Sequence, residues 1–193
     1  MSILVAGLII FFAVHLVSIV NEGWRDRMLE RIGEGPWKGV YSLVAIIGFV
    51  LMVWGYGLTR LESEILFIAP HWLRHLAMLL LLPVFPLLLA TYLPGRIQAL
   101  ARHPMLIATI LWSFAHLLVN GRLADVLLFG AFLLWAALDL FSMRRRTLRA
   151  LPGAPASKVN DVIALTFGLV LYALFVLWLH GLLVGVALIA SIM

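Results

Sequence analysis

The 193-residue sequence contains no cysteine and few charged residues. Without cysteine the chain can form no disulfide, thiolate metal site, iron–sulfur cluster or covalently attached c-type haem, so nitrogen or oxygen atoms must hold any cofactor. Charged side chains make up 12% of the residues and hydrophobic ones 64%, whereas soluble proteins have about a quarter charged and about half apolar residues. These proportions exclude an ordinary soluble protein and indicate an integral membrane protein.

Hydrophobic stretches account for most of the chain and predict its architecture. Most of them approach the ~20 residues that a helix needs to cross the hydrocarbon core, although the fourth is short and the sixth is long. We therefore expect an all-α fold, a polytopic membrane helical bundle of about six transmembrane helices that forms a single domain over residues 1–193. The stretches cover residues 3–22, 37–58, 71–92, 104–119, 123–143 and 162–191.

The net charge of +5 does not favour nucleic-acid binding, because the basic residues lie in loops between the stretches. Most of them fall in the first, third and fifth loops, the last of which includes Arg149 and is expected to meet anionic lipid head groups. By the positive-inside rule these loops are cytoplasmic, so both termini face outward, which is the periplasm for the bacterial inner-membrane protein that we expect. The first stretch lacks a preceding Lys or Arg and a small-x-small cleavage site, so we expect it to remain as a span.

Two segments outside the centres of the spans carry specific expectations. The first loop alternates acidic and basic residues from Glu22 to Glu34 and ends on Gly-Glu-Gly-Pro. This pattern predicts a short amphipathic helix at the membrane surface, with a solvated linker as the alternative. Asp139, near the inner end of the fifth stretch, is expected to pair with the Arg144 to Arg146 cluster.

Four histidines lie inside stretches that otherwise have the character of membrane spans: His15, His75, His116 and His180. Each is a candidate functional residue, because a polar ring is costly in hydrocarbon and still needs a donor and an acceptor partner. A structural hydrogen bond explains any one of them, but several on different spans favour axial ligation of a haem iron or a proton relay. Depth along the helices leaves two pairs open, His15 with His116 and His75 with His180.

Further polar residues adjoin these histidines. His71 and His75 lie four residues apart on one helical face, a spacing that can chelate a metal, but no HExxH motif surrounds them and Arg74 favours interfacial polarity or contact with an anion. His103, in the Arg-His-Pro motif at 102–104, caps the fourth span or contacts a head group or substrate. Ser113 lies one helical turn before His116 and is either close to a bound ligand or an ordinary serine that bonds its own helix backbone. Asn120 lies one turn after His116 and either forms a tight turn with Gly121 or hydrogen-bonds a ligand.

Residues 102–136, RHPMLIATILWSFAHLLVNGRLADVLLFGAFLLWA, closely resemble the central signature of the NnrU family of membrane proteins. GLIIFFAVHL, GVYSLVAIIGFVLMVWGY and WLRHLAMLLLLPVFPLLL fit the same family in order, so the resemblance covers nearly the whole chain. NnrU proteins are associated with denitrification and nitric oxide metabolism. They are also similar to the plastid 15-cis-zeta-carotene isomerase, a membrane enzyme that binds haem b.

The resemblance implies a haem b whose iron ligands are His15 and His116, and His103 matches a further histidine of the isomerase. Ser113 departs from the isomerase pattern, which has a cysteine implicated in exchanging iron ligands at that position. A serine cannot replace a thiolate in such an exchange, so the resemblance supports haem ligation better than isomerisation by the same switch.

The leading hypothesis is an inner-membrane haem b protein that serves nitrogen-oxide or redox physiology as an enzyme, electron carrier or sensor. In it Arg74, His75 and Arg122 are propionate or outer-pocket contacts, and Ser113 and Asn120 lie near the cofactor. The alternatives are a haem-dependent cis–trans isomerase of carotenoids or other polyenes, and a cofactor-free accessory subunit of a membrane reductase. The expected partners are the lipid bilayer and a membrane redox or denitrification protein. The Arg-His-Pro motif also resembles isoprenylcysteine methyltransferases, but their paired acidic residues are missing.

Overall fold

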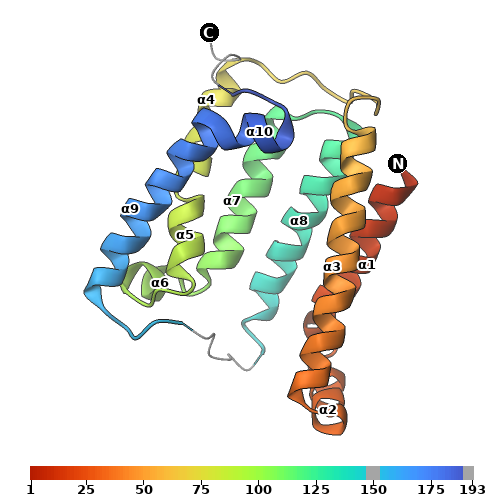
Figure 1. Cartoon of the computed structure of the whole chain (residues 1–193), viewed down its shortest axis with the longest axis vertical. Helices are drawn as coiled ribbons and strands as arrows, with labels where there is room; N and C mark the ends of the chain where they lie inside the picture. Colours follow the sequence, from red (N-terminus) through yellow and green to blue (C-terminus); the bar gives the residue numbers. More distant parts are fainter. Residues whose placement is uncertain (147–152, 189–193) are drawn as a thin grey trace. The chain divides into compact units, whose positions relative to one another are not determined.

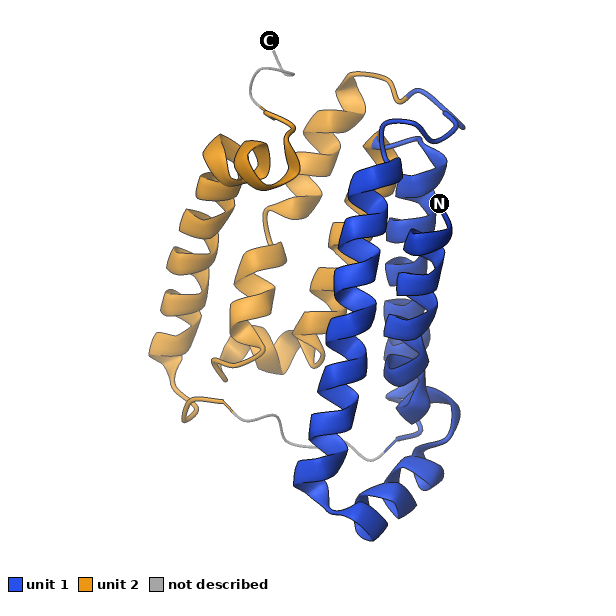
Figure 2. Cartoon of the chain, turned by 45° about the vertical axis from the view of Figure 1, so that its right-hand side comes forward, with its two compact units in different colours: residues 1–68, 120–148 blue, residues 69–119, 149–193 orange. Residues whose placement is uncertain are grey.

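The structure, a computed structural model, describes residues 1–146 and 153–188. Over these residues the chain is helical, and the extended pairing they contain is an isolated bridge between Ile65 and Arg122. Packing divides the chain into two compact units (Figure 2). Unit 1 consists of residues 1–68 and 120–148, and unit 2 consists of residues 69–119 and 149–193. Arg149, which the sequence assigns to the basic fifth loop, lies outside the described residues.

Figure 1 shows the helices in chain order. Unit 1 contains α1 (Ser2–Val20), α2 (Glu22–Ile32), α3 (Glu34–Thr59) and α8 (Leu123–Ser142). Unit 2 contains α4 (Trp72–Leu81), α5 (Val84–Ala90), α6 (Arg96–Ala101), α7 (Pro104–Val119), α9 (Lys158–Leu174), the π-helical turn η1 (Phe175–Leu179) and α10 (His180–Val184).

The predicted membrane spans correspond closely to these helices. In the described part of the chain, five helical segments are long and apolar enough to cross a membrane: Ser2–Val20, Glu34–Thr59, Trp72–Ala90, Leu123–Ser142 and Lys158–Val184. The fourth predicted span is the apolar helix α7, which has 16 residues and falls short of that length, as its sequence indicated. The all-α membrane fold is therefore confirmed, and the expected number of about six spans is close.

The first loop forms a helix, as one of its two interpretations predicted. The Asn21 side chain accepts a hydrogen bond from the backbone N–H of Trp24 at 2.9 Å and so caps the start of α2. The helix ends at Gly33, whose φ of 84° is a conformation that glycine adopts readily. α3 then begins at Glu34, three residues before the predicted span, because Pro36 is tolerated in the first turn of a helix.

In unit 1, α1 and α3 pack closely along small residues. A Cβ atom on Gly55 would lie 2.3 Å from the backbone nitrogen of Leu4, and one on Gly48 would lie 2.5 Å from that of Phe11. Neither position has room for a side chain, so the two backbones are in direct contact. Association of helices in lipid depends on such close packing, because hydrocarbon gives no hydrophobic driving force between them.

The third predicted span of the chain, which lies in unit 2, is interrupted rather than continuous. α4 ends at Leu81 and α5 begins at Val84, with Pro83 between them, because proline has no N–H to bond the carbonyl four residues earlier. The N–H of Leu82 is shared between the carbonyls of Met78 and Leu79, at 3.2 and 3.3 Å. The Tyr172 hydroxyl of α9 donates to the Met78 carbonyl at 2.9 Å, so a neighbouring helix bonds the backbone beside the break.

The sixth predicted span also differs from its expected bounds. It begins earlier, at Lys158, where the Ser157 side chain caps α9, and its helical part ends at Val184 rather than at residue 191. Gly185 follows in the left-handed conformation with a φ of 74°, which ends the helix. Near the other end of α9, the Asp161 carboxylate accepts hydrogen bonds from the N–H groups of Arg96 and Ile97, at 2.9 and 3.0 Å, and thereby holds the start of α6.

Candidate functional site

His15 lies in α1 among aromatic rings contributed by three helices of unit 1. Its ring stacks on Phe11 of α1 with the centroids 4.1 Å apart and an interplanar angle of 23°. Tyr41 of α3 lies 5.4 Å away, and Trp135 of α8 meets the imidazole edge to face at 5.6 Å. The imidazole is therefore half-buried in an aromatic cage, and its rotation is restricted by packing on several sides.

The hydrogen bond of His15 determines which nitrogen carries the proton. Nδ1 lies 2.7 Å from the carbonyl oxygen of Phe11, one turn earlier in the same helix. A carbonyl oxygen can only accept, so Nδ1–H is the donor and a neutral ring keeps its lone pair on Nε2. This is the arrangement in which histidines bind metal ions, with one nitrogen bonded to a carbonyl and the other directed at the metal.

His116 of α7 has the same local arrangement within unit 2. Its Nδ1 lies 2.8 Å from the carbonyl oxygen of Trp112, again four residues earlier, and the Trp112 ring is tilted against it with the centroids 5.3 Å apart. Nδ1–H is again the donor, so the lone pair of a neutral ring is on Nε2. The two histidines that the resemblance selects thus share one tautomer and one kind of backbone anchor.

Ser113 and Asn120 lie close to His116 in the sequence but have different environments. The Ser113 side chain is completely buried, and its hydroxyl donates to the carbonyl of Thr109 in the same helix. This bond is the back-bonding arrangement common for serine in membrane helices, and it uses the single hydroxyl proton. Asn120 follows α7 directly and is half-buried.

The remaining histidines of unit 2 are placed differently. His75 is exposed on α4, and half-buried Arg74 precedes it, with its N–H donating to the His71 carbonyl at 3.1 Å. His103 is half-buried between α6 and α7, and its carbonyl accepts from the N–H of Ile107 at 3.1 Å in the first turn of α7. The carbonyl of His103 thus takes part in the first backbone hydrogen bond of α7.

His180 belongs to α10 and makes a different hydrogen bond from those of His15 and His116. Its Nδ1 lies 2.8 Å from the carbonyl oxygen of Val186, six residues later and beyond the end of the helix. The bond ties the segment after α10 back onto the helix, so it has a structural role in the turn at Gly185. When His180 is neutral, its lone pair is also on Nε2, so His180 remains a candidate ligand in the alternative pair with His75.

A buried polar cluster at one end of unit 1 was not predicted from the sequence. The Tyr56 hydroxyl of α3 donates to the Asp125 carboxylate of α8 at 2.6 Å, and Asp125 is only 7% exposed. The same carboxylate accepts from the backbone N–H of Arg122 at 3.2 Å, and the Arg122 guanidinium donates to the Ser63 carbonyl at 2.8 Å. The signal in the sequence was an acidic residue three positions into a helix, which is typical of an N-terminal cap.

The expected pairing of Asp139 is confirmed. Its carboxylate accepts from the Arg146 guanidinium, and the two side chains are 12% and 13% exposed. The Ser142 hydroxyl bonds the Asp139 carbonyl at 2.8 Å, while Arg144 and Arg145 each lie against the ring of Phe141. Asp139 therefore serves to neutralise a buried arginine, and its role is structural.

Within residues 1–146 and 153–188, no three His, Asp or Glu side chains gather into a group that could hold a metal ion. The spacing of His71 and His75 therefore gains no further ligand of this kind in that part of the chain. An iron held by a porphyrin needs only one or two axial ligands, and single histidines on separate helices suffice for it.

Comparison with known proteins assigns the chain to a family. The family model described as NnrU protein matches residues 3–188, which covers nearly all of both units and, apart from Ser2, all of the helices described above. The chain belongs to the NnrU family. No curated protein and no solved structure matches it. The match places His15 and His116 of this NnrU protein inside the shared region, together with the Arg-His-Pro motif.

Proposed function

We propose that this NnrU-family protein binds haem b in a bacterial inner membrane, where His15 and His116 would hold the iron through Nε2, and serves nitrogen-oxide metabolism. One observation carries the proposal. Both imidazoles donate Nδ1–H to the carbonyl four residues earlier in their own helix, so the lone pair of each neutral ring is on Nε2, the atom that would bind the iron.

The residues present fit a non-covalent haem with nitrogen ligands. The chain has no cysteine for a thiolate ligand or a thioether link, and histidine is a common axial ligand of haem b. When bound, the haem would supply a one-electron redox centre.

The contribution of the chain itself is to orient the ligands and to exclude water. The carbonyl of Phe11 fixes the tautomer of His15, and the ring of Phe11 fixes the plane of the imidazole. Tyr41 and Trp135 shield the same ring from solvent. A carbonyl partner also makes the imidazole a stronger ligand, because it shares the Nδ1 proton as electron density moves to Nε2.

Absorption spectroscopy of the detergent-purified protein from haem-supplied cells tests the proposal. We expect a Soret band that shifts on reduction and a stoichiometry of one haem per chain. His15→Gly and His116→Gly should each lose or alter the band, and added imidazole should restore it by occupying the vacated ligand position.

The matched controls are His75→Ala and His180→Ala, which remove the alternative pair. They should retain the wild-type spectrum. Loss of haem in these two variants with retention in the other two would transfer the ligand site to His75 and His180. A colourless wild-type protein would refute haem binding and favour the accessory-subunit function.

A haem-dependent polyene isomerase is the second candidate, on the motif resemblance. Ser113 stands where the isomerase pattern has a cysteine, and its buried hydroxyl donates to the carbonyl of Thr109, so any isomerisation would have to proceed without a thiolate. Incubating the reduced protein with a cis-polyene and separating the products by chromatography tests this function. A trans product formed by wild type and lost in His116→Gly would support it, and no product from a haem-loaded protein would refute it.

A further inference from the structure

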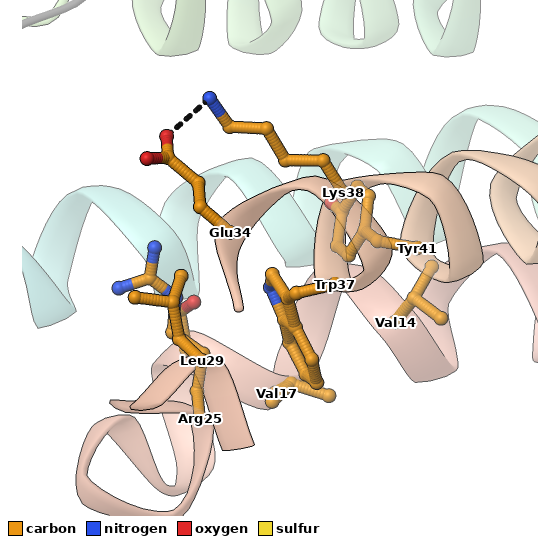
Figure 3. A pocket seen from close by; sticks show the side chains of 9 residues that line it. Val14, Val17, Arg25, Leu29, Glu34, Trp37, Lys38 and Tyr41 are labelled. Carbon is orange, nitrogen blue, oxygen red and sulfur yellow. Dashed lines mark ion pairs between the residues drawn. The ribbon is translucent and has the colours of Figure 1, made fainter. Parts of the chain in front are cut away.

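A cleft of about 280 Å³ opens at one end of unit 1, where α1, α2 and α3 meet (Figure 3). It shares Tyr41 with the cage of His15, and no function described above uses its other lining residues. Charged side chains line one part of it, namely Arg25, Glu34 and Lys38, and apolar side chains line the other. A ligand that fills it must therefore have a charged part and an apolar part.

The register of α1 against α3 gives the level of this cleft in the membrane. α1 has 19 residues and so spans about 28 Å, close to the ~30 Å thickness of the hydrocarbon core. Contacts of Gly55 with Leu4 and of Gly48 with Phe11 put Val20, the end of α1, beside Gly39. The start of α3, residues 34–38, therefore extends beyond the core into the head-group layer, and the charged part of the cleft lies there.

The apolar and aromatic lining continues from that level towards the core. Val14 and Val17 of α1 form the apolar wall, with Trp37 and Tyr41 of α3 facing it. Trp37 also meets Trp24 of α2 edge to face at 5.9 Å. Tryptophan and tyrosine favour the boundary between head groups and hydrocarbon, because their rings are apolar at one end and polar at the other.

The two cations of the cleft differ in their freedom to take a new partner. Arg25 bonds the Asp26 carboxylate through one guanidinium nitrogen at 2.9 Å, and its side chain is 18% exposed. It keeps further N–H donors for a second anion. Lys38 lies 2.5 Å from the Glu34 carboxylate, but both side chains are about 70% exposed at the mouth. Exposed pairs of this kind contribute little stability, so Lys38 can turn to an incoming anion at small cost.

We propose that this cleft binds the head group of a glycerophospholipid, with the phosphodiester held by Arg25 and Lys38 and the acyl chains lying along Val14 and Val17. A phosphodiester supplies a second anion for Arg25 and an alternative partner for Lys38, and the lipid has the required apolar part. Glu34 then remains available to a head-group ammonium. A lipid of the surrounding bilayer is favoured over a soluble phosphate because the apolar wall continues into the hydrocarbon.

Native mass spectrometry of the delipidated full chain tests this site. The probes are dioleoyl phosphatidylethanolamine, dioleoyl phosphatidylglycerol and, as the soluble phosphate source, glycerol 3-phosphate. Arg25→Gln with Lys38→Gln should weaken binding of the preferred lipid about thirtyfold, from about 1 kcal/mol for each cation near a membrane surface. The matched control, Arg27→Gln with Arg31→Gln, removes the same charge from α2 outside the cleft and should change binding less than twofold.

A second variant guards against misfolding of the double mutant. Val17→Phe places a larger ring in the apolar part of the cleft without changing its charge, and it should also weaken lipid binding. Equal weakening by the control pair would show a general charge effect and overturn the proposal. Glycerol 3-phosphate binding as tightly as the lipids would also overturn it, because the apolar wall would then contribute nothing. The haem spectrum is an independent readout, so failure of this site and failure of haem binding are distinguishable.

Discussion

The contact between α1 and α3 leads to a prediction that uses two glycines of the same helix. Gly55 faces α1, whereas a Cβ on Gly57 would meet nothing within 4 Å. The substitutions Gly55→Ala and Gly57→Ala therefore add the same methyl group to α3, one inside the helix contact and one outside it. Their comparison isolates the cost of separating the two helices.

The expected size of the effect follows from the geometry at Gly55. The added carbon would lie 2.3 Å from the backbone nitrogen of Leu4 and 2.7 Å from its Cα atom, whereas heavy atoms pack at about 3.5–4.0 Å. Backbone atoms cannot move aside as a side chain can, so α1 must shift by about 1 Å. Overpacking of this kind costs about 1–3 kcal/mol of the free energy of unfolding, and Gly57→Ala should stay within about 0.5 kcal/mol of wild type.

Unfolding in mixed micelles of a mild detergent and SDS, followed by tryptophan fluorescence, measures both variants under the same conditions. Gly55→Ala should unfold at a lower SDS fraction than wild type, and Gly57→Ala should not. If the two variants unfold together, the close approach of α1 and α3 is wrong. A Gly48→Ala variant gives a second measurement, since its Cβ would lie 2.5 Å from the nitrogen of Phe11.

Two further predictions concern buried polar pairs of unit 1. Asp139→Asn leaves Arg146 buried without a counter-charge and should lower the free energy of unfolding by about 3–5 kcal/mol. Adding Arg146→Met should recover most of that loss in the same SDS titration. If the double variant recovers no stability, the pairing of Asp139 with Arg146 is wrong. Tyr56→Phe removes a hydrogen bond to a charged carboxylate and should cost about 1.5–3 kcal/mol. A double-mutant cycle of Tyr56→Phe with Asp125→Ala checks this, since a coupling energy near zero would show that the two groups do not interact.

Much of the fold could be predicted because the lipid bilayer imposes it on each segment separately. The ~20-residue length and the apolar composition of a span can be counted in the sequence. Pro104 at the start of α7, Gly33 at the end of α2 and the pairing of Asp139 also follow from local rules. The breaks were less predictable. Pro83 interrupts its span because it has no N–H. The hydroxyl that bonds the Met78 carbonyl beside the break comes from Tyr172, 94 residues away in the sequence.

Part of the candidate site could also be predicted from the sequence. A histidine in an apolar stretch is rare enough to attract attention wherever it occurs, and the family signature ranked His15 and His116 above the others. The aromatic cage of His15 was not visible, because its rings come from α1, α3 and α8. Nor was the cleft at Arg25 and Lys38, since it exists only where three helices meet.

The sequence by itself determined that this is a helical membrane protein of the NnrU type, with approximately known spans and a short list of polar residues inside them. Only the tertiary structure decided which faces meet, which carbonyl binds each imidazole and where Tyr56 finds Asp125. The physical reason is that a membrane helix is apolar on the face towards lipid as well as on the face towards its neighbours. Hydrophobic periodicity, which reveals the packed face of a soluble helix, therefore reveals little here.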